Sequence, residues 1–129
     1  MKKILIIDDE PQIRSMLKML FEREGFHVVV ACDGKEGTRL FEQDPADLVI
    51  TDLIMPEKEG VETIRELRKK NPVLPIVAMS GGGRSAPDGY LHMAKLLGAN
   101  AVFKKPIAKE DLLKIVRDLG LERDDQARV

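Results

Sequence analysis

Short apolar runs alternate with amphipathic stretches along the whole chain, and this alternation limits the possible folds most strongly. The apolar runs lie at 4–7, 28–31, 48–51, 76–79 and 101–103. Runs this short, several of them rich in Val and Ile, are typical of strands that are buried on both faces of a parallel sheet. Parallel strands need crossover connections, and helices normally supply them. The sequence therefore predicts an α/β domain with a five-stranded, doubly wound parallel sheet.

The stretches between the predicted strands have helical periodicity. In the first, apolar residues recur at every third or fourth position from Ile13 to Phe21, and Pro11 stands near its start. Four further helices are expected at 35–41, 61–67, 90–97 and 112–119. Gly98 and Gly120 follow the last two of these, where glycine commonly ends a helix. Five strands and five helices in strict alternation are expected.

The composition is that of an ordinary globular domain. Apolar residues make up 43% of the 129 residues, charged residues 33%, and the formal net charge is −1. No basic excess favours direct binding to nucleic acid or to a membrane surface. No apolar run approaches the about 18 residues that a membrane span needs. We therefore expect a cytoplasmic protein with one domain at 1–121 and a polar tail at 122–129.

The single cysteine, Cys32, excludes an internal disulfide and suits a reducing compartment. It follows the second predicted strand directly. Free cysteine behaves as a small apolar residue, so we expect Cys32 to pack in or beside that strand.

Charged and polar side chains stand where the predicted strands end. The first strand ends in Asp8 and Asp9, the third in Asp52 and the fourth in Ser80, and the fifth runs into Lys104 and Lys105. Ligands of open parallel sheets bind at the carboxyl ends of the strands. If the five strands form one sheet, these side chains converge on one pocket.

The residue types in this predicted pocket favour phosphoryl chemistry. Crowded carboxylates repel one another, and oxygen ligands suit Mg²⁺. A lysine supplies a compact positive charge for a phosphoryl group, and a serine hydroxyl donates a hydrogen bond. A carboxylate can itself be the nucleophile. We therefore expect phosphoryl transfer to Asp52, with Mg²⁺ neutralising the transferred group.

Each of these residues also has a simpler interpretation. Asp8 or Asp9 could cap the helix that begins near Pro11. Asp52 could be a turn residue, and Ser80 could merely begin a loop. Lysines are usually solvated at the surface, which would account for Lys105.

Four sequence motifs together resemble the receiver domain of bacterial response regulators. They are "IIDDEP", "DLVITDLIMPEKEG", "PIVAMSG" and "VFKKPI", in this order, and the resemblance covers about residues 3–119. The resemblance implies a flavodoxin-like (βα)5 fold with strand order 2-1-3-4-5. This order comes from the family and not from the pattern of apolar residues.

The resemblance also implies a role for each residue of the predicted metal site. Asp52 would be the phosphoacceptor and a Mg²⁺ ligand. Asp9 would ligate Mg²⁺ directly, and Asp8 would do so directly or through water. The backbone carbonyl of Ile54 would complete the protein's share of the ligands.

Further roles follow from the same resemblance. Ser80 would bind a phosphoryl oxygen, and Lys105 would precede a cis peptide bond to Pro106, with Lys104 pointing elsewhere. Gly60 would allow the turn after "MPEKEG". Receivers usually carry an aromatic residue three positions before the lysine, where this chain has Val102, and Phe103 should face the opposite side of the strand.

By this resemblance the chain is a signalling domain and not an enzyme that turns over a small molecule. A histidine kinase or a histidine phosphotransfer protein would supply the phosphoryl group, and the receiver would catalyse its own phosphorylation and dephosphorylation. The output protein or domain is not identified by the sequence. No DNA-binding module follows residue 120, so the receiver either stands alone or is part of a longer protein.

Two alternatives are weaker. A phosphate-independent binding module with the same fold is favoured only by Val102. A phosphatase of the haloacid dehalogenase type would carry its nucleophile after the first strand in a DxDx[TV] pattern, whereas this chain has "DDEP" there.

Overall fold

The computed structural model describes residues 2–53, 60–80, 92, 95–96, 98–105 and 108–121. Within these residues, strands and helices alternate as predicted up to residue 80 and again from residue 101 onward. The elements are β1 (Lys3–Ile7), α1 (Pro11–Arg23), β2 (His27–Ala31), α2 (Gly34–Gln43), β3 (Leu48–Asp52), α3 (Gly60–Lys70), β4 (Ile76–Ser80), β5 (Ala101–Lys104) and α5 (Lys109–Asp118). The helix predicted at 90–97 lies largely outside the described residues.

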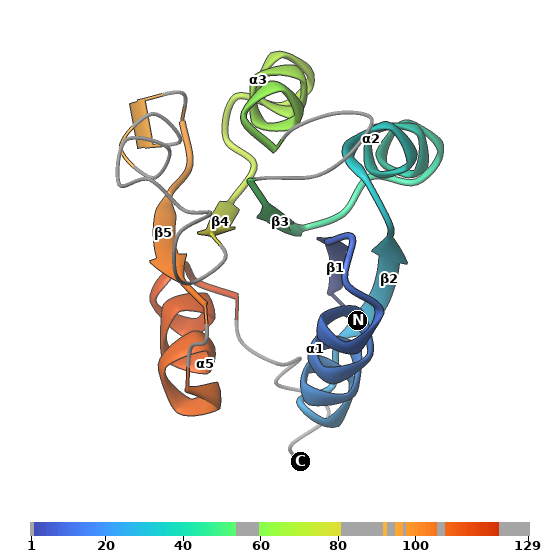
Figure 1. The fold of residues 1–129 in the computed structure, drawn as a ribbon. Helices are drawn as coiled ribbons and strands as arrows, with labels where there is room; N and C mark the ends of the chain where they lie inside the picture. The colour runs from blue at the N-terminus through green and yellow to red at the C-terminus, as the bar shows by residue number, and fades with distance from the viewer. Residues whose placement is uncertain are drawn as a thin grey trace.

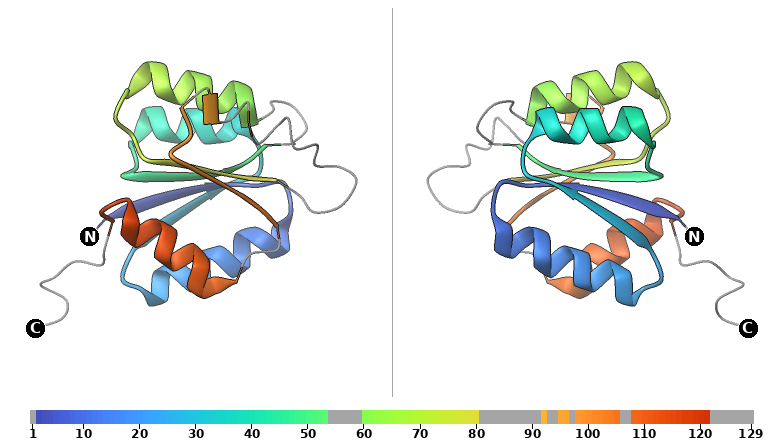
Figure 2. Two further views of the ribbon diagram at one scale, coloured as in Figure 1. Left: turned by 90° about the vertical axis from the view of Figure 1, so that its left-hand side faces the viewer. Right: turned by 90° about the vertical axis from the view of Figure 1, so that its right-hand side faces the viewer.

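The five strands form one parallel sheet with the order β2-β1-β3-β4-β5. This order is the one that the receiver resemblance implied. Helices α2 and α3 cover one face of the sheet, and α1 and α5 cover the other (Figure 1). Figure 2 shows the same three layers from the two sides. None of the helices in the described ranges is long and apolar enough to cross a membrane.

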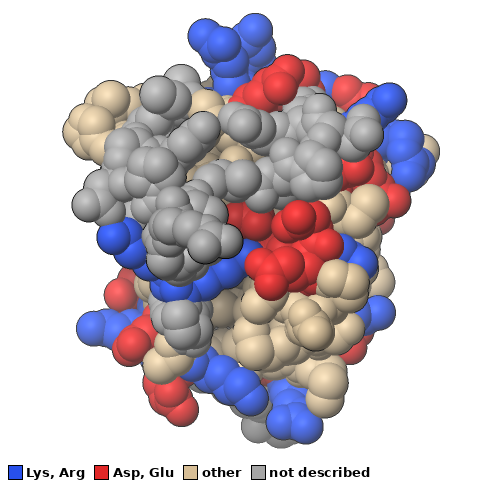
Figure 3. All heavy atoms as spheres, in the orientation of Figure 1, with Lys and Arg blue, Asp and Glu red and all other residues tan. Residues whose placement is uncertain are grey.

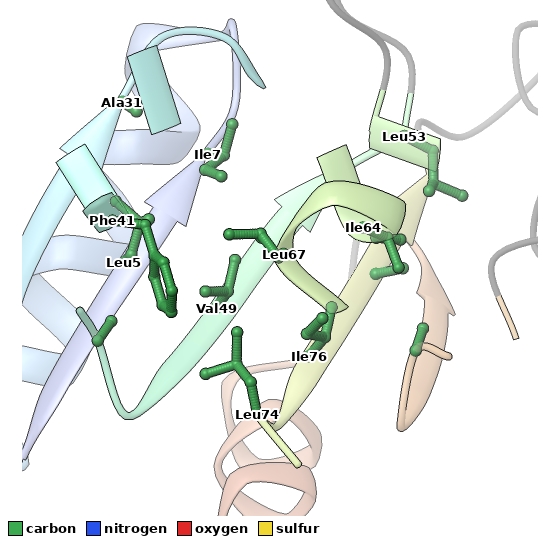
Figure 4. Close-up of a cluster of buried hydrophobic side chains, with 13 residues drawn as sticks. Leu5, Ile7, Ala31, Phe41, Val49, Leu53, Ile64, Leu67, Leu74 and Ile76 are labelled. Carbon is green, nitrogen blue, oxygen red and sulfur yellow. The ribbon is translucent and has the colours of Figure 1, made fainter. Parts of the chain in front are cut away.

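The core consists of two apolar clusters, one on each face of the sheet. Leu5 and Ile7 of β1 point into the cluster beneath α2 and α3, which also contains Leu67 (Figure 4). Ile4 and Ile6 point into the cluster shared with α1 and α5. Consecutive side chains of a strand point to opposite faces, so a strand between two helical layers must be apolar throughout. This geometry explains why the strands were recognisable as continuous apolar runs.

Two predicted site residues are the last residues of their strands, as the sequence predicted. Asp52 is the last residue of β3, opposite Met79, and Ser80 is the last residue of β4, opposite Lys104. The ladder continues past the apolar runs because its bonds join backbone groups, which need partners whatever the side chain is.

The prediction that Cys32 packs in or beside the second strand is wrong as regards packing. β2 ends at Ala31, which is buried, and the Cys32 side chain is exposed. The Cys32 N–H donates to Glu36 Oε1 at 2.8 Å. The chain has therefore already turned away from the sheet at Cys32, towards the start of α2.

Candidate functional site

Side chains from three strand ends meet at the carboxyl edge of the sheet. Asp8 directly follows β1, Asp52 ends β3, and Lys105 directly follows β5. Lys105 Nζ lies 2.7 Å from Asp8 Oδ2, 3.3 Å from Asp52 Oδ2 and 3.2 Å from Glu10 Oε1. Figure 3 shows Asp and Glu side chains gathered near the middle of one face of the molecule, beside Lys and Arg atoms. The predicted convergence of Asp8, Asp52 and Lys105 is thus present in the structure.

Asp8 is held in place by hydrogen bonds along its own segment. Its side chain is fully buried, and Asp8 Oδ1 accepts a hydrogen bond from the Glu10 N–H at 2.8 Å. Arg14 of α1 donates to the Asp8 backbone carbonyl at 2.8 Å. The N-cap residue of α1 is Glu10, whose side chain makes no capping bond. Neither Asp8 nor Asp9 is therefore the N-cap of α1. The simpler interpretation of these two residues as helix caps is wrong.

Asp52 is a buried carboxylate in an unfavourable electrostatic position. Its Oδ1 accepts a hydrogen bond from the Leu53 N–H at 2.8 Å, and only 4% of the residue is exposed. Burial, followed by the charge of Asp8, raises the pKa of Asp52 to about 6. Burial also raises the pKa of Asp8, against the opposing hydrogen bond from Lys105.

Lys105 remains an ammonium ion in this setting. Burial by itself would lower its pKa, but the hydrogen bond with Asp8 and the charges of Asp52 and Asp8 outweigh burial, so the pKa of Lys105 is raised. One ammonium ion faces three carboxylates, those of Asp8, Glu10 and Asp52. The site therefore has an excess of negative charge.

The carboxylates meet the requirements of a divalent cation site. One oxygen each from Asp8, Asp9, Glu10 and Asp52 lies within 4.8 Å of the others. Asp8 Oδ2 is buried, and among the described residues it faces the Lys105 ammonium at 2.7 Å. A hard cation that takes oxygen ligands, such as Mg²⁺, would offset the negative charge that one lysine leaves on this cluster. Ile54, the predicted carbonyl ligand, lies outside the described residues.

Glu10 is the site residue that sequence reasoning missed. It stands in the "DDE" run, and its carboxylate reaches Lys105 across 95 positions of sequence. The only signal for it was the acidic run itself, which does not indicate which of the three carboxylates contacts the lysine.

Ser80 lies at the end of β4 next to the two lysines, of which one turns towards the carboxylates. Ser80 is fully buried, and its backbone carbonyl accepts a hydrogen bond from the Lys105 N–H at 2.7 Å. The Lys104 side chain is exposed, whereas only 11% of the Lys105 side chain is. Lys105, and not Lys104, therefore lies beside the carboxylates. Pro106 lies outside the described residues, so the cis peptide stays a prediction.

The two faces of β5 carry the residues that the sequence assigned to them. Val102 packs against the cluster beneath α2 and α3, and Phe103 packs against the cluster with α1 and α5. Phe103 therefore does not substitute for the aromatic residue that receivers usually carry at the position of Val102.

Gly60 is the first residue of α3, and the turn that the sequence predicts before it lies outside the described residues. A Cβ atom placed on it would lie 2.0 Å from the Asp52 carbonyl oxygen and 2.6 Å from Leu53 Cα. The glycine thus lets α3 begin directly against the backbone that carries Asp52.

Comparison with known proteins decides the family. The model of the response regulator receiver domain matches residues 4–117. The chain belongs to this family. The receiver is 37% identical over 117 residues to the transcriptional regulatory protein CpxR of Escherichia coli, covering 91% of this chain and 48% of that protein. The alkaline phosphatase synthesis regulator PhoP of Bacillus subtilis is 32% identical, with 86% and 45% covered. The chain thus spans about half the length of these relatives.

Solved structures agree with the family. A receiver domain from Clostridium thermocellum superposes with a TM-score of 0.84 at 32% identity and covers 92% of this chain and 94% of that one. The response regulator TrrA of Thermotoga maritima, solved in complex with Mg²⁺ and BeF, has a TM-score of 0.81 at 32% identity, with 92% and 99% covered. This chain is therefore a response regulator receiver domain of the two-component type.

Proposed function

We propose that this receiver accepts a phosphoryl group on Asp52 from a phosphohistidine donor, in a reaction that requires Mg²⁺. The observation that carries the proposal is the placement of Asp52, whose buried carboxylate lies 3.3 Å from the Lys105 ammonium and among the carboxylates of Asp8 and Asp9. A lone carboxylate is a weak nucleophile towards a phosphoryl group unless the developing charge is neutralised. Lys105 provides part of that neutralisation.

In the proposed transfer, each bond that forms is matched by a bond that breaks. An Asp52 carboxylate oxygen attacks phosphorus and forms an acyl phosphate bond, while the bond between phosphorus and the donor's histidine nitrogen breaks. The electron pair returns to the imidazole, which takes up a proton. Lys105 would pair with one phosphoryl oxygen, and the Ser80 hydroxyl would donate to another.

Asp8, Asp9 and Asp52 would hold the Mg²⁺ ion, because their oxygens already lie together. When bound, Mg²⁺ supplies charge neutralisation for the phosphoryl oxygens. The complex of the Thermotoga regulator with Mg²⁺ and BeF supports this choice of metal. Glu10 contributes an oxygen to the same cluster and also pairs with Lys105.

The phosphorylated receiver would then act on an output protein or domain through a shift between two conformations. Curated relatives that are about twice as long are named transcriptional regulators. We propose a histidine kinase or phosphotransfer protein as the donor, and a regulatory partner of the same kind as the target.

The test is incubation with acetyl phosphate and Mg²⁺, followed by intact mass spectrometry. The wild type should gain one phosphoryl group, and Asp52→Asn should gain none. Asp118→Asn, which alters an exposed carboxylate at the end of α5, is the matched control and should be phosphorylated as the wild type is. Excess EDTA should abolish the gain.

A wild type that stays unphosphorylated, both with acetyl phosphate and with a phosphohistidine donor, would contradict the proposal. That result would favour the phosphate-independent binding module, the alternative suggested by Val102.

A further inference from the structure

Arg68, in the last turn of α3, joins two chain connections at the end of the sheet opposite to Asp52. Its guanidinium donates to three carbonyls in the connection to β4 and to two groups just before β5. The acceptors are Asn71 O (3.2 Å), Pro72 O (3.0 Å), Leu74 O (2.6 Å), Gly98 O (2.5 Å) and Asn100 Oδ1 (3.2 Å). A planar guanidinium group with five N–H donors can serve several converging acceptors at once, whereas the ammonium group of a lysine is poorly suited to this arrangement.

Asn100 links Arg68 to the start of the β4–β5 ladder through hydrogen bonds. Its Oδ1 accepts a second hydrogen bond from the Ile76 N–H at 2.9 Å. Its own N–H donates to the Ile76 carbonyl at 2.7 Å. Asn100 therefore holds both backbone groups of the first residue of β4, while Arg68 holds Asn100.

The backbone at Gly98 leaves room for the Arg68 side chain. Gly98 has φ +115°, a conformation that side chains disfavour. A Cβ atom there would lie 2.9 Å from Arg68 Nε. Both the conformation and the lack of a side chain at this position are thus matched to the Arg68 contact.

The register of β5 needs such an anchor. Among the described strands, β5 lies at the edge of the sheet and pairs with β4 alone. Its apolar residues Ala101, Val102 and Phe103 are all half-buried, so the strand lacks the alternation of apolar and polar residues that normally specifies register. Lys104 and Lys105 are adjacent, and a shift of one residue would bring Lys104 to the place of Lys105.

We propose that Arg68 is a positioning residue which, through Asn100, fixes the register of β5 on β4 and so places Lys105 beside Asp8 and Asp52. At the far end of the strand the Lys105 N–H bonds to the Ser80 carbonyl, which completes a ladder pinned at both ends. The proposal concerns register, and only its kinetic readout rests on the proposed phosphorylation.

The first measurement is made without any phosphoryl donor. Arg68→Met is compared with Arg65→Met, which removes an exposed arginine from the same helix. Nuclear Overhauser contacts between the paired residues Ala78 and Val102 report the register by NMR. Arg65→Met should retain these contacts. Arg68→Met should lose them, or show a second set of pairings alongside them.

Asn100 variants provide an independent pair should Arg68→Met fail to fold. Both bonds to Asn100 Oδ1 need only an acceptor, so Asn100→Asp should keep the native pairing. Asn100→Ala removes the acceptor and should disturb the pairing as Arg68→Met does.

The second measurement is phosphorylation by acetyl phosphate per folded molecule. We expect Arg68→Met and Asn100→Ala to lower the maximal rate at least about tenfold, since a misplacement of about 1 Å can cost on the order of a hundredfold. The Mg²⁺ concentration for half-maximal rate should stay unchanged, because the carboxylates are intact. Lys104→Ala should be neutral in the wild type but further lower the rate in Arg68→Met.

Native pairing and a native rate in folded Arg68→Met and Asn100→Ala would overturn the inference. If the variants show altered pairing but the wild type accepts no phosphate, the register role of Arg68 is supported and the proposed function is contradicted.

Discussion

The position of the Asp52 carboxylate lowers the folding stability of the free protein at neutral pH. The carboxylate is nearly fully buried, and it lies close to the carboxylate of Asp8. The folded protein therefore binds the Asp52 proton more tightly than the unfolded chain does, with the pKa of Asp52 raised from 3.8 to about 6. Between these two values the folded state holds more protons, so stability is lost as the pH rises through about 6. The site is thus built for a positive partner and not for the stability of the free domain.

Asp52→Asn should therefore be more stable than the wild type at neutral pH in the absence of metal. The gain should be about 1–2 kcal/mol in the free energy of unfolding, less than the full shift because solvent screens part of the charge. It should shrink as the pH falls from about 6 and be smallest below 3.8, where Asp52 is protonated in both states. Urea unfolding in EDTA at several pH values measures this difference. An equal difference at all pH values would show that charge is not its cause.

The start of α3 determines how closely a helix approaches the phosphoacceptor strand. The Gly60 N–H donates to the Leu53 carbonyl at 2.9 Å, and its Cα faces the Asp52 carbonyl. A methyl group there would meet backbone and not a flexible side chain, so either α3 or the end of β3 would have to move.

Gly60→Ala should destabilise the domain by about 1–3 kcal/mol, the usual cost of overpacking. It should also lower the phosphorylation rate per folded molecule, because the end of β3 carries Asp52. Glu62→Ala, an exposed change in the same first turn, is the matched control and should do neither. Thermal unfolding together with the acetyl phosphate assay tests both effects, and a fully native rate would show that α3 moves and β3 does not.

At the scale of the whole molecule, the parallel sheet brings distant acidic segments to one edge. The carboxylates of Asp8, Asp9 and Asp52 lie together only in the folded state. A cation that binds them therefore stabilises the fold, by about 2.7 kcal/mol at a concentration one hundred times its dissociation constant.

Mg²⁺ should raise the melting temperature at pH 7.5 by several degrees, and EDTA should reverse the rise. The effect should be smaller at pH 5, where the raised pKa of Asp52 leaves it largely protonated and proton release opposes binding. Differential scanning fluorimetry at constant ionic strength measures it, with NaCl as the salt control. An equal rise in Asp52→Asn and Asp9→Asn would mean that the ion binds elsewhere.

Much of the fold and the centre of the site could be predicted because they depend on local pattern. A strand covered on both faces must be apolar throughout, so the runs at 4–7 and 48–51 identified β1 and β3. Parallel strands place their carboxyl ends at one edge of the sheet. Asp8, Asp52 and Lys105 could therefore be assigned to one site from the sequence alone. The strand order was supplied by the family resemblance.

The remaining features depend on how distant segments are placed, and only the tertiary structure decided them. The pairing of Glu10 with Lys105, the close approach of Gly60 to Asp52 and the outward turn at Cys32 leave no periodic signal in the sequence. The bonds of Arg68 to Gly98 and Asn100 cross 30 and 32 positions of sequence. Apolar periodicity specifies which face of an element is buried. It does not specify which polar atoms meet, because that depends on the register and separation of elements after they pack.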